Sequence, residues 1–140
     1  MENQELVLLA HQIAVKAHEG QFRKDGTTPY IVHPETVAAQ FTEPHLKALA
    51  LLHDVIENSE YTLAELKKLN IPQGILDSLN RLTRRSLEKY VDYIIVCAWD
   101  SDARAVKIED IKHNLSTVQG TAKDKYELAL YILNIINSNK

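Results

Sequence analysis

Apolar residues recur every three or four positions along most of the chain, which is the spacing that places them on one face of an α-helix. In the first such segment, Leu6, Leu9, Ile13 and Ala17 follow this spacing. No segment alternates apolar and polar residues over the length of a β-strand. The pattern therefore predicts an all-α fold of seven to eight helices. The predicted helices span residues 2–19, 34–41, 44–56, 62–69, 72–82, 86–99, 102–116 and 122–136.

Glycine, proline and capping residues mark where these helices begin and end. Gly20 follows the first helix as an expected C-terminal stop. Residues 21–29 have the composition of a turn and no helical period. Pro44 suits the first turn of the third predicted helix, and Thr62 with Glu65 forms the capping-box pattern of the fourth. We find no linker or internal repeat, so we expect a single domain over residues 1–140.

Composition narrows the class of protein. The 140 residues are 45% hydrophobic and 25% charged, as in ordinary soluble globular proteins. The formal net charge of −3 argues against a broad nucleic-acid-binding surface, which is normally basic. No apolar stretch reaches the roughly 20 residues that span a bilayer, and the acidic N-terminus does not resemble a signal peptide. We therefore expect a cytoplasmic protein with no nucleic-acid or membrane partner.

The sequence LLHDVIEN places the adjacent residues His53 and Asp54 inside an apolar predicted helix. Aspartate is rarely buried without a partner, because removing its charge from water is costly, and a metal ion would supply that partner. Glu57 and Asn58 follow four residues after His53 and Asp54, so they project from the same helix face one turn along. The alternative is a helix end whose polar residues are simply solvated.

Two further positions offer metal ligands. His33 lies where a loop enters a helix, and Asp110 lies on a charged predicted helix. Taken singly, His33 fits a structural cap and Asp110 fits a solvated helix face. Together with His53 and Asp54, they offer two imidazoles and two carboxylates, a set that suits Mn²⁺, Fe²⁺ or Zn²⁺ better than Ca²⁺ or Mg²⁺. Such an ion lowers the pKa of water and polarises a phosphoryl oxygen, and Glu57 could orient or deprotonate that water.

Several stretches resemble one family of enzymes. The block AHEGQFRKDGTTPYIVHP at residues 17–34, together with HDVIE, LTR and VKIEDIKHN further along, closely resembles the hydrolase domain of the Rel/SpoT alarmone enzymes and their small stand-alone relatives. These enzymes are members of the HD superfamily of metal-dependent phosphohydrolases. The matching blocks run over residues 10–117. The resemblance implies an HD-domain helical bundle that removes the 3′-pyrophosphate from guanosine tetra- and pentaphosphate, (p)ppGpp, with Mn²⁺ as the metal.

The resemblance also implies a role for each matching position. The four metal ligands would be His33, His53, Asp54 and Asp110. The catalytic positions that act on the attacking water would be Glu57 and Asn58. The small phosphorylated nucleotide would contact Arg23, Lys24 and Asn114. A planar guanidinium and a mobile ammonium are both suited to phosphate, which agrees with this assignment.

Two positions depart from the family's pattern. Asn58 stands where the family usually has an aspartate, and an amide can neither take a proton nor add negative charge near a metal. Ser116 stands where an arginine is common. These departures keep two alternatives open. One is an HD-type phosphatase acting on another phosphorylated nucleotide such as NADPH, and the other is a weakly active module that binds metal and nucleotide.

Other polar and aromatic residues receive no role in the predicted site. His113 is expected to point away from the site on its helix. Tyrosines such as Tyr90 and Tyr93 are expected at the edge of the core, with solvated hydroxyls. Thr117 and Lys125 could approach a substrate but are assigned no contact. Apolar residues of the last helix fit either the core or a homodimer contact.

Overall fold

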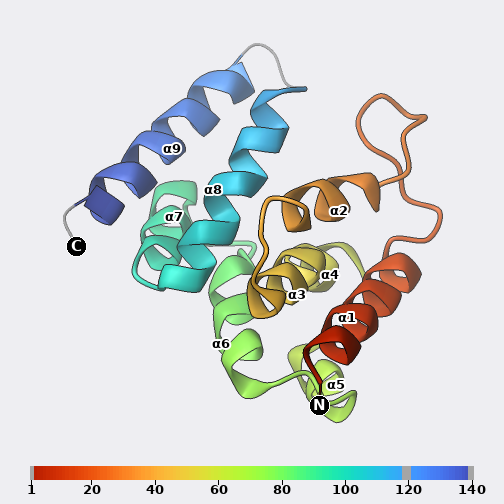
Figure 1. Cartoon of the computed structure of the whole chain (residues 1–140). Helices are drawn as coiled ribbons and strands as arrows, with labels where there is room; N and C mark the ends of the chain where they lie inside the picture. The colour runs from red at the N-terminus through yellow and green to blue at the C-terminus, as the bar shows by residue number, and fades with distance from the viewer. Residues whose placement is uncertain (1, 118–120, 139–140) are drawn as a thin grey trace.

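The computed structural model describes residues 2–117 and 121–138, and within these ranges every element longer than a single bridge is a helix (Figure 1). The helices are α1 (Asn3–Ala17), α2 (Val32–Ala38), α3 (Pro44–Leu52), α4 (Val55–Asn58), α5 (Leu63–Lys68), α6 (Gln73–Leu82), α7 (Tyr90–Ala98), α8 (Ser101–Leu115) and α9 (Thr121–Ser138). The all-α prediction is confirmed. In the described ranges, no helix is both long enough and apolar enough to cross a membrane.

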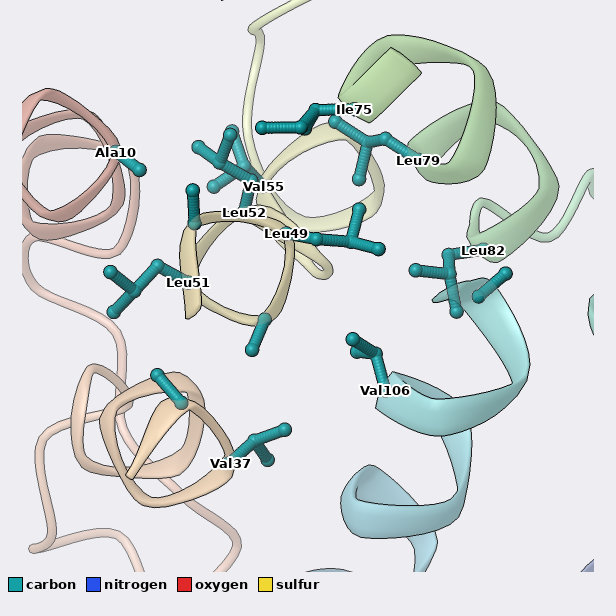
Figure 2. Close-up of a cluster of buried hydrophobic side chains, with 14 of the residues drawn as sticks. Ala10, Val37, Leu49, Leu51, Leu52, Val55, Ile75, Leu79, Leu82 and Val106 are labelled. Carbon is teal, nitrogen blue, oxygen red and sulfur yellow. The ribbon is translucent and has the colours of Figure 1, made fainter. Parts of the chain in front are cut away.

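Helix α3 lies at the centre of the fold, in contact with α1, α2, α6 and α8. Its residues 48–52 are all buried, so it presents apolar side chains to every neighbour. Figure 2 shows Leu49, Leu51 and Leu52 of α3 among side chains of the surrounding helices, including Val37 of α2 and Val106 of α8. Burying one leucine contributes about 1.5–3 kcal/mol. This helix therefore anchors the neighbouring elements, whose ends carry polar residues.

Helices α6 to α9 form a second packed group beside α3. Helix α7 contacts α6, α8 and α9, and α9 also packs along α8 (Figure 1). Ile94, Val106 and Leu133 are fully buried and come from α7, α8 and α9. Helix α8 therefore has α2 and α3 on one side and α7 and α9 on the other. Because of this position, polar residues of α8 can meet polar residues of α2 and of the turn after α3.

The predicted helix over residues 44–56 is interrupted. Helix α3 ends at Leu52, α4 begins at Val55, and His53 and Asp54 form the turn between them. Asp54 has φ −105° and ψ 0°, away from the values of a regular helix. The prediction of one continuous helix was wrong because the apolar residues on both sides of the turn keep nearly helical spacing, which hides so short a break.

Helix α7 begins at Tyr90, later than the predicted start at residue 86. The side chain of Arg85 donates to the backbone carbonyls of Asn80 and Thr83 at 2.7 Å and 2.6 Å. The backbone N–H of Glu88 donates to the carbonyl of Arg85 at 3.1 Å. These hydrogen bonds hold the segment before α7 as a turn, so the helix cannot start earlier.

The other boundary signals behave as predicted. Gly20 adopts a left-handed φ of 76° after α1, which favours glycine at this position. The side chains and backbone of Thr62 and Glu65 form the predicted capping box at the start of α5. An isolated antiparallel bridge joins Phe22 and Pro29 and closes the loop between α1 and α2. This closed loop lies next to the polar residues described below.

Candidate active site

Four predicted ligands from separate parts of the chain meet in one place. His33 lies on α2, His53 and Asp54 lie in the turn between α3 and α4, and Asp110 lies on α8. One ligand atom from each side chain lies within 4.8 Å of all the others. The Nε2 atom of His33 is 2.8 Å from Oδ1 of Asp110 and 3.3 Å from Nε2 of His53. The Nε2 atom of His53 is 3.1 Å from Oδ2 of Asp54.

Backbone and side-chain hydrogen bonds orient the two imidazoles. Nδ1 of His53 lies 2.6 Å from the carbonyl oxygen of Ala50, which can only accept, so Nδ1 carries a proton and Nε2 is the nitrogen that faces the cluster. Nδ1 of His33 lies 2.6 Å from Nδ1 of His113, and the two rings stack with 4.9 Å between centroids. In metal sites, hydrogen bonds of this kind fix the tautomer and the direction of the ligand.

Hydrogen bonds from two side chains orient the carboxylates. The hydroxyl of Tyr30 donates to Oδ2 of Asp54 at 2.6 Å, and Nζ of Lys107 donates to Oδ2 of Asp110 at 2.7 Å. The ring of Tyr30 is itself held by the buried His18, whose ring centroid is 4.8 Å away. Each carboxylate therefore has a fixed orientation within the cluster.

The charges of the cluster shift its pKa values strongly. Burial opposes ionisation of Asp110, but the Lys107 ammonium and the His53 imidazole outweigh burial and hold the pKa of Asp110 well below its usual value. The pKa of Asp54 is also lowered, because His53 outweighs the effect of burial. Burial lowers the pKa of His53, but the two carboxylates outweigh it and raise that pKa well above its usual value. Both carboxylates are therefore ionised.

This set of donors can hold a divalent cation. It presents two imidazole nitrogens and two ionised carboxylates, and His33, His53 and Asp110 are each at most 3% exposed. Uncompensated carboxylates are costly in such a buried place, and a cation removes that cost. A mixed nitrogen and oxygen set is suited to first-row transition metals.

The predicted water-activating residues line a cavity of about 220 Å³ next to the cluster, together with Asp54 and Asp110. The carboxylate of Glu57 accepts a hydrogen bond of 2.5 Å from the backbone N–H of Arg84. Burial raises the pKa of Glu57, although this hydrogen bond opposes the rise. The backbone carbonyl of Asn58 accepts a hydrogen bond of 2.6 Å from the side chain of Gln21. Both predicted residues therefore stand beside the cluster.

The predicted nucleotide-binding residues line a second cavity of about 330 Å³. A guanidinium nitrogen of Arg23 donates to Oδ1 of Asn114 at 3.0 Å, and the guanidinium carbon lies 5.6 Å from the centre of the Tyr30 ring. Lys24 lines the same cavity. The two cavities adjoin, because Tyr30, Asn114 and Tyr126 line both of them.

Sequence reasoning missed several residues of the site. His113 contacts His33 directly, so the prediction that it points away was wrong. Lys107 and His113 lie three residues before and after Asp110, a spacing that shares its helix face and could have revealed both. The hydroxyls of Tyr90 and Tyr93 are not solvated as predicted. The hydroxyl of Tyr93 donates to the Leu82 carbonyl, and that of Tyr90 is buried with no partner among the described residues.

Comparison with known proteins identifies the chain's relatives. No protein-family model matches it. The guanosine-3′,5′-bis(diphosphate) 3′-pyrophosphohydrolase of Haemophilus influenzae is 38% identical over 81% of this chain and 19% of its own length. The bifunctional (p)ppGpp synthase/hydrolase SpoT of Escherichia coli is 32% identical over 83% of this chain and 18% of its own length. The chain is a Rel/SpoT-like domain. A GTP pyrophosphokinase of Streptomyces coelicolor is 29% identical over 84% of this chain and 15% of its own length.

The Rel/SpoT-like domain spans less than a fifth of the length of these curated relatives. The resemblance to the Rel/SpoT enzymes, drawn from the motif at residues 17–34 and from the His53–Asp54 pair, is confirmed by the sequence identity to these relatives. The roles of the individual residues and the homodimer contact stay predictions.

The Tyr30 hydroxyl provides a test of the cluster that does not depend on turnover. Changing Tyr30 to phenylalanine removes the donor to Asp54 and keeps the ring that packs on His18. Removing a residue that orients a metal ligand typically weakens metal binding, and we expect a loss of about 10- to 100-fold in Mn²⁺ affinity. Calorimetric titration with Mn²⁺ measures it. Tyr131→Phe, at a residue 65% exposed on α9, is the control, and equal affinity of both variants would contradict the prediction.

Proposed function

We propose that this Rel/SpoT-like domain is a metal-dependent phosphohydrolase that removes the 3′-pyrophosphate from (p)ppGpp. The observation that carries the proposal is the buried cluster of two histidines and two aspartates beside two cavities. One cavity contains the carboxylate of Glu57, and the other contains the cations Arg23 and Lys24. The names of the relatives, among them a guanosine-3′,5′-bis(diphosphate) 3′-pyrophosphohydrolase and a (p)ppGpp synthase/hydrolase, support the same reaction.

In this proposal one divalent cation is held by His33, His53, Asp54 and Asp110. The cation proposed is Mn²⁺, the metal implied by the family resemblance, with Fe²⁺ and Zn²⁺ as chemically suitable alternatives. When bound, such an ion polarises a phosphoryl oxygen and lowers the pKa of water. The surrounding side chains of Tyr30, Lys107 and His113 keep the ligand atoms in place.

Glu57 is proposed to accept the proton of the attacking water. Its carboxylate is held by the backbone N–H of Arg84 and faces the cavity that Asp54 and Asp110 also line. Attack on the phosphorus joined to the 3′ oxygen breaks that bond and releases pyrophosphate. The other product is the nucleoside 5′-diphosphate or 5′-triphosphate, whose 3′ oxygen takes up a proton and becomes a hydroxyl. Because the water attacks in line with the bond that breaks, Glu57 belongs on the side of the phosphorus opposite the 3′ oxygen. The nucleoside is therefore assigned to the adjoining cavity.

Arg23, Lys24 and Asn114 are proposed to hold the nucleotide in that cavity. The guanidinium of Arg23 is already anchored by Asn114 and lies near the Tyr30 ring. A guanidinium held in this way can bind a phosphate through its N–H groups or stack its plane on a base. Lys24 adds a mobile positive charge at the same place. Cations of this kind select a phosphorylated ligand over a neutral nucleoside.

The first test is hydrolysis of guanosine tetraphosphate by the metal-free protein and by the protein loaded with Mn²⁺, Fe²⁺ or Zn²⁺. Release of GDP and pyrophosphate with Mn²⁺, and none without metal, is the expected result. A parallel panel that includes NADPH, ranked by kcat/KM, tests the alternative substrate. A higher kcat/KM for NADPH than for guanosine tetraphosphate would overturn the proposed substrate.

Asn58 favours a second candidate function, a domain whose hydrolytic activity is weak. Asn58 lines the same cavity as Glu57, but its amide cannot take a proton from water. We expect Asn58→Asp to raise kcat by about tenfold or more, because general-base groups contribute on the order of 10²–10⁴-fold. Steady-state kinetics with guanosine tetraphosphate measure the change. Asn3→Asp, at an exposed residue of α1, is the matched control. An unchanged kcat in Asn58→Asp would show that Asn58 does not limit the reaction.

A further inference from the structure

Two cations share one aromatic ring beside the Glu57 cavity. The guanidinium carbon of Arg84 lies 5.3 Å from the centre of the Tyr90 ring, and Nζ of Lys125 lies 4.2 Å from the same centre. Arg84 belongs to the loop after α6, Tyr90 begins α7 and Lys125 lies on α9. Three separate parts of the chain therefore converge here, at a place that the proposed roles of the other residues do not use.

Neither cation has an anionic partner among the residues that the structure describes. Among the side chains that the structure describes, the ion pairs within 4.0 Å include neither Arg84 nor Lys125. The side chain of Arg84 makes one hydrogen bond, from Nε to the backbone carbonyl of Glu88 at 3.1 Å. Burial and the charges of Arg84, Lys107 and Lys24 lower the pKa of Lys125. Like charges held together in this way favour the binding of an anion.

The hydroxyl of Tyr90 is a further polar group at this place. It is buried and makes no hydrogen bond within the described residues. Burial raises the pKa of Tyr90 to about 12, so the hydroxyl keeps its proton and can donate. Tyr90 and Arg84 line the same cavity as Glu57 and Asp54, and Lys125 stands beside it, against the rings of Tyr90 and Tyr126.

We propose that Arg84, Tyr90 and Lys125 form a subsite for the outer phosphate of a diphosphate ester, so that the domain selects 3′-diphosphates over 3′-monophosphates. This inference rests on the proposed function. The nucleoside is assigned to the Arg23 side and the attacking water to Glu57, so the phosphate beyond the reacting one extends along the Glu57 cavity. An arginine fork and an ammonium together match the several oxygens of a terminal phosphate.

Arg84 would link two steps of the reaction. Its backbone N–H holds the carboxylate of Glu57, and its side chain would hold the outer phosphate. A substitution of the side chain leaves the backbone N–H in place, so the Arg84→Gln protein separates phosphate binding from the positioning of Glu57.

Binding of inorganic pyrophosphate tests the subsite without turnover. Calorimetry on the Mn²⁺-loaded protein compares pyrophosphate with orthophosphate for the wild type, Arg84→Gln and Lys125→Gln. We expect each variant to bind pyrophosphate about tenfold or more weakly, since hydrogen bonds between charged groups are the strong ones, and to bind orthophosphate almost as the wild type does. The control is Lys123→Gln on the same helix, where the lysine is exposed and pairs with Glu127. Unchanged pyrophosphate affinity in both variants would overturn the subsite.

Turnover supplies the second readout. The wild type is expected to prefer guanosine 5′-diphosphate 3′-diphosphate over guanosine 5′-diphosphate 3′-monophosphate, and the preference in kcat/KM should fall about tenfold in each variant. If the wild type hydrolyses neither nucleotide, but the variants bind pyrophosphate more weakly than the wild type does, the proposed function fails and the subsite stands. If it hydrolyses guanosine tetraphosphate and the variants keep its preference and its pyrophosphate affinity, the subsite fails and the function stands.

Discussion

Replacing Asp54 with alanine is expected to abolish Mn²⁺-dependent hydrolysis and to weaken Mn²⁺ binding by at least about 100-fold, beyond the loss typical of an orienting residue. Asp54 supplies one of the two carboxylates in the cluster, and its Oδ2 atom lies 3.1 Å from Nε2 of His53 and 3.6 Å from Nε2 of His33. Without it, a divalent cation would face two imidazoles and the single carboxylate of Asp110. Titration with Mn²⁺ and the rate of pyrophosphate release measure the two effects.

A matched control separates loss of the site from loss of the fold. Asp92 is an exposed aspartate in the first turn of α7, away from the cluster, so Asp92→Ala should keep both metal binding and activity. Circular dichroism on the Asp54→Ala protein should show the helical content of the wild type, because the helices are held by the apolar contacts of α3. Retained hydrolysis in a folded Asp54→Ala protein would exclude Asp54 as a ligand.

Replacing Glu57 with glutamine is expected to lower kcat by about 10²–10⁴-fold, the range typical of a general base. Glutamine keeps an oxygen that can accept the hydrogen bond from the backbone N–H of Arg84, but it cannot take a proton. Mn²⁺ affinity should stay near that of the wild type, because Glu57 is not one of the four clustered ligands. Single-turnover kinetics at saturating guanosine tetraphosphate measure the chemical step.

The prediction for Glu57 is specific because kcat should fall while Mn²⁺ affinity stays unchanged. Glu60→Gln, an exposed neighbour in the loop before α5, should leave both kcat and Mn²⁺ affinity unchanged. A Glu57→Gln protein with a kcat within a few-fold of the wild type would assign water activation to another group. A large loss of Mn²⁺ affinity would instead make Glu57 part of the metal site.

The sequence by itself predicted most of the helical fold. The three- and four-residue spacing of apolar positions located segments that correspond to all the helices of the described chain, and Gly20 and the Thr62–Glu65 capping box behaved as predicted. These features depend on local geometry, since a helix face and a cap are both determined within a few residues of the chain. The break at His53 and Asp54 was missed because so short a turn scarcely changes the spacing.

The sequence also identified which residues belong to the candidate site, through motifs shared with the Rel/SpoT proteins. The sequence could not predict by geometry that these residues lie close together in space. His33 and Asp110 are far apart in sequence, and their 2.8 Å contact exists because α8 packs against α2. Spacing along a chain carries no information about contacts between distant helices.

Tertiary structure alone decided the surroundings of the cluster. Tyr30 and Lys107 hold the two carboxylates, and His113 meets His33, although the sequence analysis gave none of the three a role in the site. Arg84 and Lys125 share the Tyr90 ring only because the loop after α6 and helix α9 both pack near α7. The physical reason is the same in each case. Burial and electrostatic partnership depend on distances in space, so the orientation of a ligand and an unpaired charge can be recognised only after the helices are packed.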